Sequence, residues 1–243
     1  MVHLITRGHS LRSGRAAAFF RRHRSLDSSC IHVTPETAEP FRCFFEEGMI
    51  MTIEVENVSF EVDGKDILKD ISWEVSSDDI WLLSGPEGSG KTALISIIIG
   101  TLAPTSGRVR LLGDYKYDRV NAGVVFQEDR LFDKMSAAEN VAIVRPETSP
   151  AVAAEELEKL MPKDLVSVPV SELSPVHRRI TAIVRAVSVP SDILIMDEPF
   201  RGMDDEMTKK VFSYIKEVAG HKGIIIAQRD QGPLPALRNL KLT

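Results

Sequence analysis

A glycine-rich turn between two apolar stretches constrains this chain more than any other feature. Residues 82–100 read LLSGPEGSGKTALISIIIG, in which Gly85, Gly90, Lys91 and Thr92 fit the pattern G-x-x-x-x-G-K-[ST]. The apolar run at 80–84 predicts a short buried strand, and the run after the turn predicts a helix that ends at Gly100. A strand, a glycine turn and a helix in this order form the context in which the pattern binds phosphate.

The residue types in the turn follow from the chemistry of a phosphate chain. Gly85, Gly88 and Gly90 let backbone N–H groups turn inward without a clash from a Cβ atom. The positive end of the following helix also attracts anions. Lys91 is expected to reach the β- and γ-phosphates, and the Thr92 hydroxyl is expected to hold Mg²⁺. The predicted nucleotide-binding loop consists of Gly85, Pro86, Glu87, Gly88, Ser89, Gly90, Lys91 and Thr92.

A buried strand that ends in two carboxylates gives the second half of the predicted site. The segment ILIMDEP (193–199) has four apolar residues followed by Asp197 and Glu198. Open α/β sheets bind ligands at the carboxyl ends of their strands. Asp197 suits a contact to Mg²⁺, directly or through water, and Glu198 suits the general base that polarises an attacking water. An Asp-Glu pair is common at strand ends, but its position about 105 residues after the glycine loop makes it informative.

Strand and helix patterns alternate along the rest of the chain. Helical patterns occupy about 131–188 and 204–220. Further strands are expected at 52–62, 66–75, 106–113, 122–127 and 223–228. Apolar strands that alternate with helices imply a mainly parallel sheet covered on both faces. The expected fold is α/β: a P-loop NTPase core with a mainly parallel sheet, an antiparallel β segment at its N-terminal side and an inserted helical subdomain at about 131–188.

Composition separates an arginine-rich leading piece from an acidic body. Residues 1–48 hold seven arginines, five acidic residues and both cysteines, whereas the whole chain has a net charge of −5. We expect 1–48 to be a targeting peptide, a disordered basic arm, or sequence before a true start at Met49 or Met51, and 49–243 to fold. The negative charge argues against a nucleic-acid partner. No window approaches the roughly 18 apolar residues of a membrane span, and two cysteines without a disulfide framework indicate a reducing compartment.

With the glycine loop and the Asp-Glu pair, the chain resembles the ATP-binding subunit of an ABC (ATP-binding cassette) transporter over almost all of 52–230. VVFQEDRLFDKMSAAENVAI resembles the family's Q-loop and the segment that follows it. ELSPVHRRITAIVRAV lies at the position of the family's signature helix. DEPFRGMDDEM resembles the family's Asp-Glu motif and the D-loop that follows it. The sequence PFRGMD within it is similar to that of importer subunits of the nitrate/sulfonate/taurine kind. The resemblance implies that two such subunits sandwich two ATP molecules, each site joining one chain's glycine loop to the other chain's signature.

The resemblance also implies an activity, partners and further site residues. The activity is ATP hydrolysis that drives solute transport through a separate membrane permease, by a cytoplasmic subunit peripheral on the inner face of the membrane. Gln127 is implied to contact Mg²⁺ or the lytic water, Ser174 to touch the γ-phosphate held by the partner chain, and Asp204 to communicate across the dimer. The predicted catalytic residues are Glu198, Gln127 and Lys91, and the predicted metal ligands are Thr92, Gln127 and Asp197.

Three departures from the family pattern bear on this interpretation. The usual signature Leu-Ser-Gly-Gly-Gln reads LSPVH at 173–177, so a proline without an N–H and a branched valine replace two glycines. The usual switch histidine is absent: ungapped spacing puts Arg229 there, and a one-residue shift puts Gln228 there. The aromatic residue that usually stacks on adenine is replaced by Val62, with Phe60 as an alternative on the same face.

The departures leave two functions open. One is an energy-coupling ATPase in a homodimer or heterodimer, where a second ATP-binding subunit with an intact signature would complement this chain's glycine loop. The other is a nucleotide-gated regulatory or clamp subunit with little hydrolysis, which the altered signature favours and Glu198 disfavours. A soluble P-loop kinase would not explain the Gln127 and Ser174 regions at their observed spacing.

Overall fold

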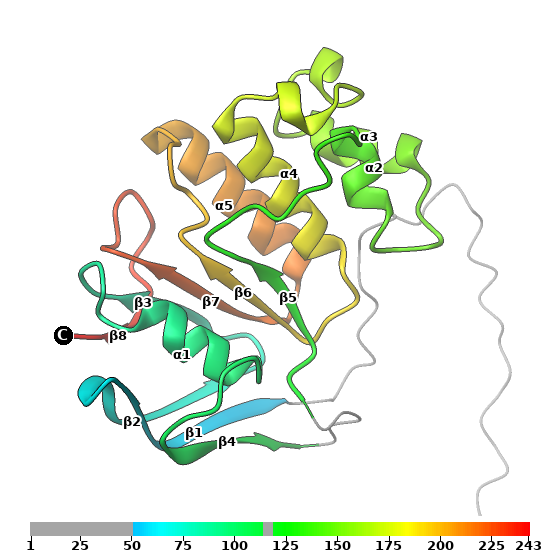
Figure 1. Ribbon diagram of the computed structural model, residues 1–243. Helices are drawn as coiled ribbons and strands as arrows, with labels where there is room; N and C mark the ends of the chain where they lie inside the picture. The colour runs from blue at the N-terminus through cyan, green and yellow to red at the C-terminus, as the bar shows by residue number, and fades with distance from the viewer. Residues whose placement is uncertain (1–50, 114–118) are drawn as a thin grey trace, which may run out of the picture. The chain divides into compact units, whose positions relative to one another are not determined.

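The computed structural model describes residues 51–113 and 119–243, so the predicted extension at 1–48 lies outside the described part of the chain (Figure 1). The described residues form two sheets that differ in strand direction. One has the order β2-β1-β4 and antiparallel pairs, and the other has the order β5-β6-β7-β3-β8 and parallel pairs. A parallel sheet accompanied by an antiparallel segment near the N-terminal side confirms the expected α/β fold.

The antiparallel sheet begins with a hairpin whose position the sequence predicts. Its strands are β1 (Thr52–Val62), β2 (Lys65–Ser76) and β4 (Ser106–Leu112). Asp63 and Gly64 join β1 to β2, and both have positive φ, as this type of turn requires. The apolar positions of the alternating pattern, such as Ile53, Val55 and Val75, are buried on the face that packs against the rest of the domain.

The parallel sheet is buried on both faces, which explains its apolar strands. Its strands are β3 (Ile80–Ser84), β5 (Ala122–Val125), β6 (Ile193–Asp197), β7 (Gly223–Gln228) and β8 (Arg238–Lys241). In β6, Ile193 and Ile195 pack in one apolar core, whereas Leu194 and Met196 pack in a second core on the opposite face.

Helices cover the two faces of the parallel sheet. Helix α1 (Lys91–Ile98) lies between the two sheets and buries Leu94, Ile95 and Ile98 in the core shared with β1 and β2 (Figure 1). Helices α4 (Pro175–Ser188) and α5 (Asp205–Ala219) cover the other face. The glycine loop, residues 85–90, therefore joins the end of a central strand to the start of a helix held on both sides.

The predicted helical stretch at 131–188 contains helices whose ends carry the expected capping residues. It comprises α2 (Ala137–Ala142), α3 (Pro150–Glu158), α4, and 3₁₀ turns at Lys163–Leu165 and Val170–Glu172. Ser136 and Glu139 form a capping box, and the side chain of Ser174 caps α4. These helices share one apolar core with the parallel sheet, so the separate helical subdomain stays a prediction. None of the described helices has the length and apolarity to cross a membrane.

Candidate functional site

An open pocket of about 650 Å³ lies where α1 begins and β6 ends. Its walls come from the glycine loop, from Asp197 and Glu198 at the end of β6, and from Gln127, Arg201 and Arg229. The fold thus brings the loop and the Asp-Glu pair, predicted as two halves of one site, into a single pocket.

The backbone of the glycine loop leaves no room for side chains at two positions. Gly85 and Gly90 have φ of 155° and 89°, a region that L-residues with side chains rarely adopt. A Cβ atom at Gly85 would lie 2.6 Å from both the Leu242 carbonyl oxygen and Ser89 Oγ, and one at Gly90 would lie 2.7 Å from Leu68 Cδ2. The glycines are therefore required by packing and by backbone conformation at these two positions.

Polar groups of the loop point to a ligand. Lys91 is 7% exposed, and its Nζ donates to the carbonyl oxygens of Gly85 and Pro86 at 2.7 and 2.8 Å. The ammonium is thereby held across the loop, at the edge of the pocket that it lines. Ser89 Oγ is buried, and no hydrogen-bond partner for it exists among the described residues. A buried hydroxyl without a partner is costly in a folded protein, but Ser89 is not among the residues that line the pocket.

The groups predicted to hold a metal fit Mg²⁺. Thr92 Oγ1 donates to Asp197 Oδ2 at 2.6 Å, and Gln127 lines the same pocket. Hydroxyl, carboxylate and amide oxygens are the hard donors that Mg²⁺ prefers. Within the described ranges no three His, Cys, Asp or Glu side chains cluster to hold a metal by themselves. That suits an ion that binds one or two protein carboxylates and completes its shell with water and phosphate oxygens.

Glu198 occupies a strained position beside the pocket. Its φ is 49°, an uncommon left-handed value, and its N–H donates to the Ala227 carbonyl oxygen at 2.8 Å. Burial raises the pKa of its carboxyl above the usual value, the positive charge of Lys91 opposes this change, and the charge of Asp197 adds to it. A raised pKa makes this carboxylate a better proton acceptor near neutral pH.

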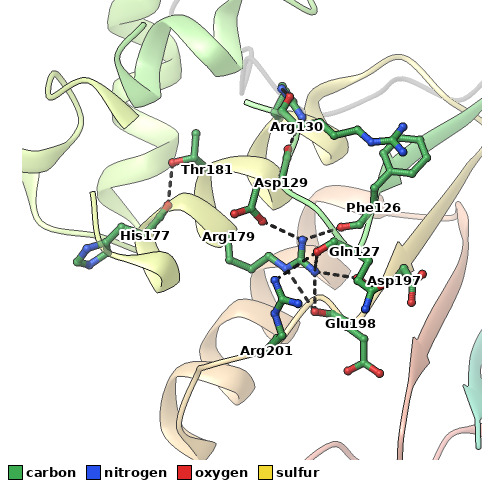
Figure 2. A network of polar contacts seen from close by, with 11 residues as sticks. Phe126, Gln127, Asp129, Arg130, His177, Arg179, Thr181, Asp197, Glu198 and Arg201 are labelled. Carbon is green, nitrogen blue, oxygen red and sulfur yellow. Dashed lines mark hydrogen bonds and ion pairs between the residues drawn. The ribbon is translucent and has the colours of Figure 1, made fainter. Parts of the chain in front are cut away.

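A buried arginine ties three segments of the site together (Figure 2). Arg179, on α4, has a side chain that is 2% exposed, and its Nη1 donates to the Phe126 carbonyl oxygen at 2.7 Å and to Asp129 Oδ1 at 2.9 Å. Its Nη2 donates to the carbonyl oxygens of Asp197 and Glu198, each at 2.9 Å. One guanidinium therefore connects the predicted signature helix with the Gln127 segment and the end of β6.

The structure gathers some of the predicted site residues and leaves others outside the pocket. Ser174 and Asp204 cap the N-terminal ends of α4 and α5 and do not line the pocket, so their roles toward a partner chain stay predictions. Val62 is 44% exposed at the end of β1, and Ile67 lines the pocket in its place. Arg229 lines the pocket, whereas the side chain of Gln228 donates to the Asp230 carbonyl oxygen at 2.6 Å.

Sequence reasoning missed four residues of the site: Ile67, Ala93 and Arg201, which line the pocket, and Arg179, which is hydrogen-bonded to the end of β6. Arg179 left a signal, because it falls in a helix of high apolar content next to the buried Ile180. Arg201 lies in a connection whose conformation the sequence does not specify, so its place in the pocket could be learned only from the structure.

The parallel sheet, the glycine loop before α1 and the carboxylates after β6 together define the P-loop NTPase fold. The family model described as ABC transporter matches residues 68–201, and the chain belongs to this family. The resemblance noted in the sequence is thereby confirmed.

Curated relatives carry the names of import ATP-binding proteins. The sulfate/thiosulfate import ATP-binding protein CysA of Thermosynechococcus vestitus is 32% identical over 179 residues, which cover 69% of this chain and 53% of that protein. CysA of Escherichia coli (strain K12) is 32% identical over 183 residues, which cover 69% of this chain and 50% of that protein. The chain spans about half the length of the curated relatives it matches.

Solved structures of ABC proteins share the fold. A bacterial Atm1-family ABC exporter with ATP bound has a TM-score of 0.67 and 21% identity, over 79% of this chain and 37% of that one. The ATP-binding cassette MJ0796, a dimer in a post-hydrolysis state with ADP and Pi, has a TM-score of 0.63 and 22% identity, over 73% of this chain and 88% of that one. These likenesses concern the fold.

Proposed function

We propose that the chain is the ATP-binding subunit of an ABC transporter, which binds and hydrolyses MgATP and passes the free energy to a separate membrane permease. The observation that carries the proposal is the single pocket shared by Lys91, Thr92, Asp197 and Glu198. Membership of the ABC family and the relatives' names as import ATP-binding proteins support it. In this proposal the subunit acts on the cytoplasmic face of the membrane.

Each residue of the pocket has a chemical task in this proposal. The backbone N–H groups of the loop and the Lys91 ammonium bind the phosphates, because both are positively polarised. Thr92 and Asp197 would hold Mg²⁺, and Gln127 would complete the coordination of the ion or orient the attacking water. The ion would neutralise charge on the phosphate oxygens. Glu198 would accept the proton of the attacking water, since its pKa is raised and it lies in the same pocket.

The first test of the proposal is the substitution Lys91→Met, which keeps the apolar stem and removes the ammonium. We expect the affinity for MgATP to fall by about 10- to 100-fold, because a charge-assisted hydrogen bond is lost. Isothermal titration calorimetry of the full chain measures the change. The control is Lys209→Ala, which removes one positive charge from an exposed position on α5. Equal affinities of wild type and Lys91→Met would contradict the proposal.

The altered signature supports a heterodimer as the working state. Ser174 is exposed at the start of α4, where its Oγ accepts the N–H of His177 at 3.3 Å and lies 3.0 Å from His177 Nδ1. Pro175 follows and offers no N–H. The signature that this chain would present to a partner's nucleotide therefore lacks hydrogen-bond donors, whereas the glycine loop of this chain is intact. We propose that a second ATP-binding subunit with a complete signature pairs with this loop.

Restoring the signature should raise the activity of the chain alone. We expect Pro175→Gly/Val176→Gly/His177→Gln to increase steady-state ATPase by about 10- to 100-fold, since one lost oxyanion donor alone costs roughly 10²–10³ in rate in other enzymes. The measurement is ATPase rate against protein concentration, because two chains must meet. The same triple substitution in a Glu198→Gln background is the control and should show no gain. Fast, cooperative ATPase of the unaltered chain would overturn the proposed need for a different partner.

A nucleotide-gated clamp with little hydrolysis is the second candidate function. It is favoured by Pro175 and Val176 in the signature and by Arg229 in place of a switch histidine. The intact pair Asp197 and Glu198 favours the ATPase, since a clamp has no need of a general base. A single-turnover comparison of wild type with Glu198→Gln separates the two.

A further inference from the structure

Arg201 lies in the pocket without an assigned task. It belongs to the connection between β6 and α5, lines the pocket and is itself exposed. Its Nη2 donates to the Gln127 carbonyl oxygen at 3.4 Å, which is a long contact. Figure 2 shows its side chain extending toward Gln127 and Arg179, close to Glu198. The guanidinium is therefore placed among the residues proposed to act at the terminal phosphate.

The donors of Arg201 are largely unused by the protein. A guanidinium has five N–H donors, and within residues 51–113 and 119–243 no carboxylate forms an ion pair with that of Arg201. The neighbouring Arg179, in contrast, is saturated by Asp129 and backbone carbonyls. Arg201 therefore keeps N–H donors that an anionic ligand can use.

Arg201 also contributes to the charge balance of the pocket. Three cationic side chains line it, namely Lys91, Arg201 and Arg229, against the three carboxylates Glu87, Asp197 and Glu198. Without Arg201 these carboxylates would outnumber the cationic side chains, which would weaken the attraction of the pocket for a polyphosphate. Lys91 acts on Glu198 but is held by the loop carbonyls, and Arg201 adds a further cation near Glu198.

We propose that Arg201 donates hydrogen bonds to the terminal phosphate of the nucleotide bound by its own chain. This inference rests on the proposed function. Arg201 thereby supplies, in the same subunit, a fixed positive charge in a site that lacks the usual switch histidine. An arginine is suited to this task because its planar fork matches phosphate oxygens and its charge is fixed. A guanidinium at the transferring phosphoryl group stabilises the charge that develops there.

The test compares a triphosphate with a diphosphate. We expect Arg201→Ala to weaken binding of the Mg²⁺ complex of a non-hydrolysable ATP analogue by about 10- to 100-fold, the value of one or two charge-assisted hydrogen bonds. The affinity for MgADP should change by less than about twofold, because ADP lacks the terminal phosphate. Arg201→Lys should recover part of the loss, since it keeps the charge and loses the fork. Isothermal titration calorimetry of the full-length wild type and of both variants measures these affinities.

Controls separate this inference from the proposed function. Lys209→Ala removes the same charge outside the pocket and should leave both affinities unchanged. Equal weakening of analogue and ADP by Arg201→Ala, or no weakening, would overturn the role of Arg201 while the proposed function stands. Wild-type protein that binds neither nucleotide would overturn both.

Discussion

Glu198→Gln is expected to slow single-turnover hydrolysis of ATP by about 10²–10⁴-fold, the usual contribution of a general base. Gln keeps the size of the side chain and its place beside the pocket but cannot accept the proton of water. MgATP binding should persist, because Lys91, Thr92 and Asp197 are untouched. Rapid mixing of excess protein with labelled ATP gives the rate, and calorimetry gives the affinity.

A stability measurement checks that the substitution acts through the carboxylate. Burial raises the pKa of Glu198, so the folded state binds this proton more tightly than the unfolded chain. Below the pKa that Glu198 has in the unfolded chain, its protonated carboxyl makes its full contribution to the free energy of unfolding. This contribution is lost as the pH rises through the pKa that Glu198 has in the folded state. At neutral pH, without metal or nucleotide, Glu198→Gln should therefore raise the Tm. The rise should disappear near pH 4, where a glutamate is largely protonated in the unfolded chain.

The outcome also decides between the two candidate functions. If wild type and Glu198→Gln hydrolyse ATP at the same slow rate while both bind it, the clamp is the correct interpretation. If the wild type is faster by the stated factor, the energy-coupling ATPase is supported. The Asp197→Asn variant is the matched comparison, since it alters the neighbouring carboxylate that Thr92 contacts and should impair Mg²⁺-dependent binding as well.

The fold followed from the sequence wherever local pattern and burial agree. The alternation in 52–62 and the apolar run at 193–196 each predict a strand, and both strands form because their apolar residues find a buried face, with Val62 at the exposed end of β1 as the exception. β8 was missed because Arg238–Lys241 is short and largely polar. Such an edge strand is held by pairing with β3, which its own residues do not specify.

The residues of the site could be predicted where a sequence motif specifies their chemistry. They could not be predicted where only the packing of the folded domain brings residues into contact. Thr92 and Asp197 are 105 residues apart, yet two motifs predict that both belong to one metal site, and the structure places them within hydrogen-bond distance of each other. Arg179 and Arg201 belong to no such pair. Their positions depend on how α4 and the connection after β6 meet the Gln127 segment, which is a property of the packed domain.

Arg179→Met is expected to lower the free energy of unfolding by about 3–5 kcal/mol, the usual cost of removing one partner from a buried ion pair. Asp129 would lose its cation, and the carbonyl oxygens of Phe126, Asp197 and Glu198 would lose donors that water cannot easily replace. For a chain of this size the corresponding fall in Tm is about 6–20 °C. Urea unfolding followed by circular dichroism measures the change.

The adjacent arginine provides the matched control. Arg178 has a side chain that is 28% exposed, pairs with Asp133, which is 66% exposed, and donates to the Val170 carbonyl oxygen at 2.8 Å, so Arg178→Met should cost about 1–2 kcal/mol, less than Arg179→Met. Similar small losses in both variants would show that the Arg179 contacts are not stabilising. A large loss for Arg179→Met alone would establish that one buried guanidinium holds the signature helix, the Gln127 segment and Glu198 in a common arrangement. A movement of α4 would then be transmitted to Glu198 through this side chain, since its guanidinium donates directly to the Glu198 carbonyl oxygen.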